Sequence, residues 1–157
     1  EAIEKEYGKV DAIAGVATGG IALGALVAQE LGLPFIYVRS KAKAHGLGNA
    51  IEGDLSVLTN VVVIEDLIST GQSSLKAVDA LREAGVEVKG LIAIFTYGLP
   101  AAQAAFEASQ CKWLTLTDYP TMLDQALVEG YLNDEQRTLL DAWNSDPVAW
   151  SDSFESK

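Results

Sequence analysis

The stretch VVVIEDLISTGQSS, residues 61–74, decides the fold of this chain. It begins as an apolar run of β-branched residues, which predicts a buried strand. Two adjacent carboxylates, Glu65 and Asp66, stand at the end of that run, and a short turn of Ser, Thr and Gly leads directly into a helical pattern. A strand that passes through such a turn into a helix is typical of an α/β protein.

The flanking sequence continues this alternation of strand and helix. We expect strands over 10–16, 34–40, 59–66, 86–97 and 111–119, and helices over 21–32, 73–85, 100–109, 120–130 and 134–144. Residues 41–55 are polar and aperiodic, which predicts a long loop that can add a short antiparallel hairpin. The whole pattern predicts one three-layer α/β/α domain over 1–157 with a mostly parallel sheet. Its main strands should lie in the order 2-1-3-4-5, which puts the two phosphate-type turns side by side.

Composition excludes several classes of protein. The 157 residues include 22 acidic and 11 basic side chains, for a formal charge of −11, so nucleic acid is not expected as a partner. With 49% apolar residues the chain can bury a core, and no apolar run is long enough to span a membrane. One cysteine, Cys111, and no signal peptide indicate a cytoplasmic protein.

The chain does not start with Met and residues 1–9 read as the end of a helix, so we expect a fragment.

The turn after the third strand has the chemistry of an anion site. A helix start with free N–H groups beside small hydroxyl residues binds phosphate, and the adjacent carboxylates can hold a sugar diol or Mg²⁺. A sugar phosphate would fit both features, with its phosphate at the helix start and its diol on the carboxylates. The alternative is that Ser69, Thr70 and Ser73 are turn and N-cap residues beside solvated acids. A Walker A loop is excluded, because no Gly-Lys pair is followed by Ser or Thr.

Residues 39–53 form a local positive region in an acidic chain. Arg39, Lys41 and Lys43 lie within five positions and precede His45, the only histidine. This pattern suits a polyanionic substrate, and Gly46, Gly48 and Gly53 supply the flexibility of a closing lid. The alternative is an exposed basic loop without a ligand.

The turn GVATGG, residues 15–20, is a weaker signal. Its small residues would let backbone N–H groups approach a phosphate, but taken alone it favours a structural tight turn. A dinucleotide site is a further alternative. However, G-x-G-x-x-G is absent and the second strand ends in Arg39 rather than an acid, which only a site for a 2′-phosphate would fit.

These segments together resemble the type I phosphoribosyltransferases, and among them the orotate phosphoribosyltransferases. VVVIEDLISTGQSSLKAVDALREAG (61–85) resembles the phosphoribosyl pyrophosphate signature, and GVATGG resembles the pyrophosphate-binding loop. YVRSKAKAHGLGNAIEG (37–53) resembles the mobile catalytic loop, while FTYG (95–98), LTLTDY (114–119) and DPVAW (146–150) resemble the carboxyl-terminal part. The resemblance implies transfer of phosphoribosyl to orotate, which gives orotidine 5′-monophosphate and pyrophosphate in pyrimidine biosynthesis. It further implies Mg²⁺ and a homodimer in which the loop 39–53 acts across the interface.

The same resemblance implies a role for each site residue. Lys43, His45 and Asp66 would be catalytic, with Lys43 steadying the leaving pyrophosphate. Glu65 and Asp66 would serve the ribose hydroxyls and the metal shell, directly or indirectly. The remaining contacts would be made to the pyrophosphate by Arg39, Thr18, Gly19 and Gly20, and to the 5′-phosphate by Ser69, Thr70, Gly71, Gln72 and Ser73.

The sequence also departs from the family pattern. Nothing before Val10 resembles the amino-terminal hood that helps to hold orotate. Gln72 stands where Gly is common and would crowd the turn formed by residues 69–73, which we call the phosphate turn. Leu23, Ala44 and Ala50 replace residues that are usually polar. The alternative function is therefore a truncated or engineered, non-catalytic derivative. It would bind a designed protein partner through an apolar rim at Leu23 and Ala50.

Three other features predict packing roles. Trp113 and Trp143 lie on a strand and an amphipathic helix, so we expect core or packing roles rather than a stacking platform. Cys111 is expected to be a small buried apolar residue, because no histidine lies near it in the sequence. Asn133 or Asp134 should cap the last helix.

Overall fold

A computed structural model describes residues 1–39, 50–56 and 58–155 of the chain. Within these residues, six strands form one sheet in the order β3-β2-β1-β4-β5-β6. The strands are β1 (Ala12–Val16), β2 (Phe35–Val38), β3 (Ile51–Glu52), β4 (Asn60–Ile68), β5 (Glu87–Thr96) and β6 (Trp113–Asp118). All neighbours pair in parallel except β2 and β3, which are antiparallel. The five main strands thus have the predicted order, and β3 from the 41–55 loop adds a short edge strand.

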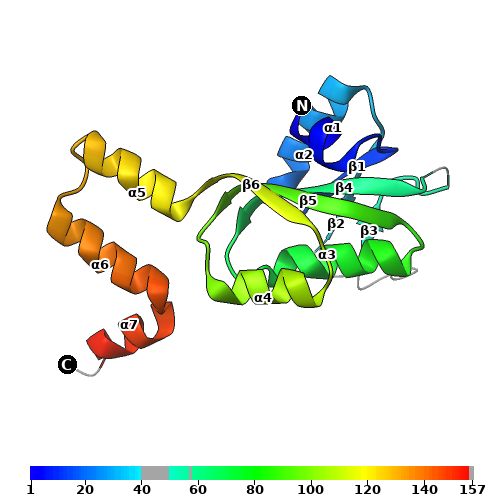
Figure 1. Cartoon of the computed structure of the whole chain (residues 1–157). Helices are drawn as coiled ribbons and strands as arrows, with labels where there is room; N and C mark the ends of the chain where they lie inside the picture. Colours follow the sequence, from blue (N-terminus) through cyan, green and yellow to red (C-terminus); the bar gives the residue numbers. More distant parts are fainter. Residues whose placement is uncertain (40–49, 57, 156–157) are drawn as a thin grey trace.

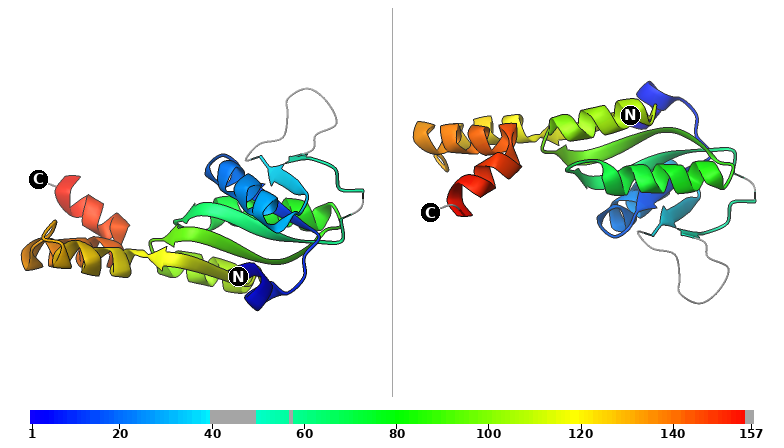
Figure 2. Two further views of the ribbon diagram at one scale, coloured as in Figure 1. Left: turned by 90° about the horizontal axis from the view of Figure 1, so that it is seen from above. Right: turned by 90° about the horizontal axis from the view of Figure 1, so that it is seen from below.

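Helices cover both faces of the sheet. The helices are α1 (Ala2–Tyr7), α2 (Gly19–Leu31), α3 (Gln72–Glu83), α4 (Pro100–Ala108), α5 (Tyr119–Val128), α6 (Asp134–Ser145) and α7 (Pro147–Glu155). Figure 1 shows α1 and α2 on one face, with α3 and α4 on the other. The last three helices follow β6 and extend beyond the end of the sheet (Figure 2). The three-layer fold is confirmed, while α7 is a helix that the sequence pattern did not predict.

Local sequence signals explain where several helices begin and end. Gly32 closes α2 in the left-handed conformation, with φ of 65°, which a residue without Cβ adopts at little cost. Pro100 lies in the first turn of α4, where its missing N–H costs no helical hydrogen bond. Asn133, rather than Asp134, caps α6 through a capping box with Gln136. None of the described helices has the length and apolar character needed to cross a membrane.

The core has two parts because successive residues of β4 point to opposite faces of the sheet. Val61 and Val63 pack in the cluster on the α3 and α4 side, which includes Phe106. Val62 and Ile64 pack in the other cluster, with Ile13 of β1. A strand buried on both faces needs a continuous apolar run, which is what residues 61–64 supply.

The aromatic residues pack as predicted. Trp113 stacks on Phe106 with ring centroids 4.8 Å apart, and Cys111 beside this pair is buried. The ring of Trp143 lies 5.5 Å from both Tyr97 and Tyr119, and this cluster joins α6 to the sheet. These contacts confirm packing roles for both tryptophans.

The structure gives no support to an apolar rim shared by Leu23 and Ala50. Both residues are half-buried, and each packs against a different part of the core. Leu23 contacts the cluster on the α2 side, whereas Ala50 contacts the cluster on the α3 side. The two residues therefore pack against clusters on opposite faces of the sheet.

Candidate active site

The sheet places the two glycine-containing turns at one edge. Strands β1 and β4 are parallel neighbours, with Gly15 opposite Ile64, so their carboxyl ends meet. The turn after β1 contains a cis peptide bond between Ala17 and Thr18. A Cβ atom on Gly19 would overlap the carboxylate of Asp66, which shows how closely the start of α2 approaches this acid. The structure therefore brings the predicted pyrophosphate turn and the predicted ribose acid together.

Two helix N-termini point toward this edge without side-chain caps. The cap residues are Thr18 for α2 and Gly71 for α3: the Thr18 side chain makes no capping hydrogen bond to a described residue, and Gly71 has no side chain to make one. The first turn of each helix also lacks an acidic residue. Backbone N–H groups at a helix start have no partner within the helix, so both ends can bind anions. Gly71 is the N-cap of α3, so the capping role considered for Ser69, Thr70 and Ser73 is wrong, whereas Ser69 and Thr70 do lie in the turn before the helix.

Glu65 and Asp66 are neighbours in sequence but differ in exposure. Glu65 is only 4% exposed, whereas Asp66 is exposed. Oε1 of Glu65 accepts the N–H of Asp66 at 3.1 Å, and Oε2 accepts the hydroxyl of Ser74 at 3.0 Å. Burial, followed by the neighbouring Asp66 carboxyl, raises the pKa of Glu65 to about 8. Asp66 is thus the member of the pair that is open to a ligand, while the role of Glu65 toward the ribose stays a prediction.

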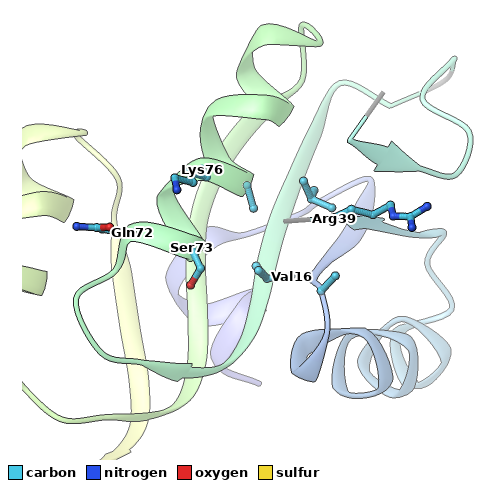
Figure 3. A pocket seen from close by; sticks show the side chains of 8 residues that line it. Val16, Arg39, Gln72, Ser73 and Lys76 are labelled. Atoms are coloured by element: carbon cyan, nitrogen blue, oxygen red, sulfur yellow. The ribbon is translucent and has the colours of Figure 1, made fainter. Parts of the chain in front are cut away.

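A pocket of about 300 Å³ lies between α3 and the ends of β1 and β2. Its lining residues are Val16, Ala17, Val38, Arg39, Gln72, Ser73, Lys76 and Ala77. Figure 3 shows Lys76 and Ser73 on the α3 side of this pocket and Arg39 on the side opposite to them. The Arg39 guanidinium forms an ion pair with Glu52 at 3.1 Å. Lys76, the ion-paired Arg39 and the N-terminus of α3 thus give this pocket groups that can bind an anion.

The structure also shows which sequence predictions this pocket includes. Arg39 and Ser73 were both predicted to bind substrate. Gln72 was expected to crowd the phosphate turn, but Figure 3 shows its amide directed away from Ser73 and Arg39. Lys76 was not predicted. It follows Gln72 by four residues, and this spacing, which puts both on one face of α3, could have found it.

A second cavity, of about 530 Å³, adjoins the phosphate turn on its other side. It lies between Ser69 and Thr70 of that turn and Trp143 and Asp146 at the end of α6.

The predicted loop residues Lys41, Lys43, Ala44 and His45 lie outside the described residues, so the structure does not place them.

The donor set at this edge fits Mg²⁺ only together with a ligand. Among the described residues, no group of three or more His, Cys, Asp or Glu side chains forms a metal site. Mg²⁺ is usually bound through one or two carboxylates plus the phosphate oxygens of a substrate. The exposed carboxylate of Asp66 beside two anion-binding helix ends meets that requirement.

Comparison with known proteins identifies the family. Residues 1–112 match the family model described as the phosphoribosyl transferase domain, which is most of the chain. The chain belongs to the phosphoribosyltransferase family. This phosphoribosyltransferase is 58% identical over 146 residues to an orotate phosphoribosyltransferase of Phocaeicola vulgatus, covering 93% of this chain and 69% of that protein. A second orotate phosphoribosyltransferase, from Porphyromonas gingivalis, is 54% identical over 148 residues, covering 94% of this chain and 70% of the relative.

A solved structure agrees with this assignment. The crystal structure of orotate phosphoribosyltransferase from Aeropyrum pernix superposes with a TM-score of 0.71 at 28% identity, covering 83% of this chain and 71% of that one. The phosphoribosyltransferase therefore shares both sequence and fold with its family. The two turns and the acids described above lie inside the matched region.

Proposed function

We propose that this phosphoribosyltransferase transfers the phosphoribosyl group of phosphoribosyl pyrophosphate to orotate, giving orotidine 5′-monophosphate and pyrophosphate. The observation that supports this most directly is the position of Asp66. Its exposed carboxylate touches the start of α2 and follows the same strand that leads into α3, so it lies between two uncapped helix ends. A sugar diol on Asp66 with a phosphate group at each helix end fits this arrangement.

The reaction breaks the bond between the anomeric carbon and the pyrophosphate oxygen, and forms a bond from that carbon to a ring nitrogen of orotate, which loses its proton. Positive charge grows on the ribose and negative charge grows on the leaving group. Preorganised N–H groups and cations stabilise such charge best because they need not reorient. In this proposal Thr18, Gly19 and Gly20 bind the pyrophosphate, and residues 69–73 bind the 5′-phosphate.

Side chains around the pocket would complete the site. Arg39 would exchange its ion pair with Glu52 for the pyrophosphate, and Lys76 would add positive charge from α3. By the family resemblance, Lys43 would steady the leaving group and His45 would close over it, excluding water that hydrolyses the sugar. Asp66 would hold the ribose hydroxyls and help to hold Mg²⁺. The bound ion supplies positive charge to the phosphate oxygens.

We also propose a cytoplasmic homodimer in which the loop 39–53 acts on the partner's site. The support is the resemblance of that loop to the family's mobile loop, together with the single buried cysteine. Sedimentation equilibrium would give the mass in solution. Mixing a K43A subunit with a D66N subunit would restore activity only if the loop acts across the interface.

Calorimetric titration of phosphoribosyl pyrophosphate, with and without Mg²⁺, tests the proposed function. We expect Mg²⁺-dependent binding, followed by formation of orotidine 5′-monophosphate when orotate is added. Binding without turnover would favour a non-catalytic derivative of the fold. A folded protein that does not bind phosphoribosyl pyrophosphate would contradict the proposal.

A further inference from the structure

Thr96 is a buried polar residue at the end of β5. Its side chain is 5% exposed and lies among apolar strands, where an unpaired hydroxyl is costly. The hydroxyl donates a hydrogen bond to the carbonyl oxygen of Ile68 at 3.2 Å and accepts one from the N–H of Gly98 at 3.0 Å. The N–H of Tyr97 donates to the same Ile68 carbonyl at 3.2 Å. Thr96 thus joins the end of β4 to the turn that follows β5.

Ile68, which accepts the hydrogen bond of Thr96, lies immediately before the phosphate turn. Ile68 is the last residue of β4, is fully buried, and directly precedes Ser69. The other end of the turn is constrained as well. Gly71 has φ of 79°, and a Cβ atom placed there would lie 2.8 Å from Cε2 of Phe106. The turn is therefore fixed at its exit by a glycine packed on Phe106, and at its entry by the hydroxyl of Thr96.

We propose that Thr96 is a positioning residue for the phosphate turn, an inference that rests on the proposed function. It does not touch the ligand, and it acts through the Ile68 carbonyl. Without the hydroxyl, Gly98 loses its hydrogen-bond acceptor and Ile68 keeps only the N–H of Tyr97. The turn would then sample more conformations in the free protein, and ordering it would reduce the affinity for phosphate.

The experiment compares Thr96→Val, which removes the hydroxyl at nearly constant shape, with Thr96→Ser, which keeps it. Thr115→Val is the matched control, because Thr115 lies on β6, one strand further from β4. We expect T96V to raise the dissociation constant of phosphoribosyl pyrophosphate about tenfold, as loss of one hydrogen bond implies. T96S and T115V should bind like the unmodified protein. The KM for orotate and kcat should stay within about twofold in T96V, since the buried Thr96 hydroxyl bonds to the backbone of Ile68 and Gly98 and would act only through it.

Hydrogen exchange provides a readout that needs no substrate. We call the hydrogen bonds of the Thr96 hydroxyl with Ile68 and Gly98 the Thr96 clamp. The amides of Tyr97 and Gly98 should exchange faster in T96V than in T96S, because T96V lacks this clamp. If the unmodified protein fails to bind phosphoribosyl pyrophosphate, the proposed function fails while the exchange result still tests the clamp. Equal affinity losses in T96S and T96V, or unchanged exchange in T96V, would overturn the proposal. Thr96→Ala replaces T96V in both measurements if T96V does not fold.

Discussion

The hydroxyl of Ser74 donates a hydrogen bond of 3.0 Å to Oε2 of Glu65, and both residues are buried. This contact joins α3 to β4 directly beneath the phosphate turn. Oε1 of the same carboxyl accepts the N–H of Asp66. The buried carboxyl of Glu65 thus bonds both to α3, through Ser74, and to the backbone of the exposed Asp66.

The pKa of Glu65 makes stability depend on pH. Burial raises the pKa of Glu65 from 4.5 to about 8, so the folded chain holds this proton more tightly than the unfolded chain does. Protonated Glu65 therefore makes its full contribution to the free energy of unfolding below about pH 4.5, the pKa of this group in the unfolded chain. That contribution is lost as the pH rises from about 4.5 to 8. Glu65→Gln, which mimics the protonated side chain, should remove this dependence and gain on the order of 3 kcal/mol relative to the unmodified protein by pH 8. Urea unfolding of both proteins between pH 5 and 9 measures the difference, and parallel curves would contradict the prediction.

Asp66→Asn should weaken binding without unfolding the chain. Asp66 is exposed at the edge of the sheet, so its charge matters for a diol or Mg²⁺ more than for the fold. We expect at least a tenfold loss of affinity for phosphoribosyl pyrophosphate with Mg²⁺, and a change in stability within about 0.5 kcal/mol. Asp79→Asn, at an exposed position on α3, is the matched control for charge. Equal affinities of the two variants would refute the placement of the ribose.

Two adjacent glycines at the start of α2 should respond differently to Ala. In Gly19→Ala the new Cβ meets the end of the Asp66 side chain, which can move, so binding should fall while stability changes by less than about 1 kcal/mol. In Gly20→Ala the new Cβ meets the backbone carbonyl of Ile64, which cannot move easily, so stability should fall by about 1–3 kcal/mol. Thermal unfolding and titration of both variants test this contrast. A stability loss in G19A as large as that in G20A would contradict it.

Lys76→Gln should reduce affinity through charge alone. Lys76 is exposed at the pocket that Arg39 also lines, so its ammonium adds to the local positive potential. We expect the KM for phosphoribosyl pyrophosphate to rise about threefold to tenfold at low ionic strength and by less at high salt. Lys5→Gln, on the distant helix α1, controls for net charge. A KM that rises equally in both variants would show that Lys76 has no specific role.

The sequence by itself determined the alternation of strands and helices, the order of the main strands and the position of the phosphate turn. These features depend on local patterns. The apolar run of β-branched residues before Glu65 favours a buried strand, and Pro100 and Gly32 limit their helices through backbone geometry. The packing of Trp113 and Cys111 followed in the same way from their places in an apolar pattern.

Only the tertiary structure decided which side chains share a site. Glu65 and Asp66 look equivalent in sequence, but strand geometry turns one into the core toward Ser74 and leaves the other exposed beside Gly19. The clamp made by Thr96 joins residues 28 positions apart, so no local pattern indicates it. Burial and long-range hydrogen bonds depend on the register between strands and on where each helix packs. A single sequence does not determine these by local propensity, because they arise only when distant segments meet.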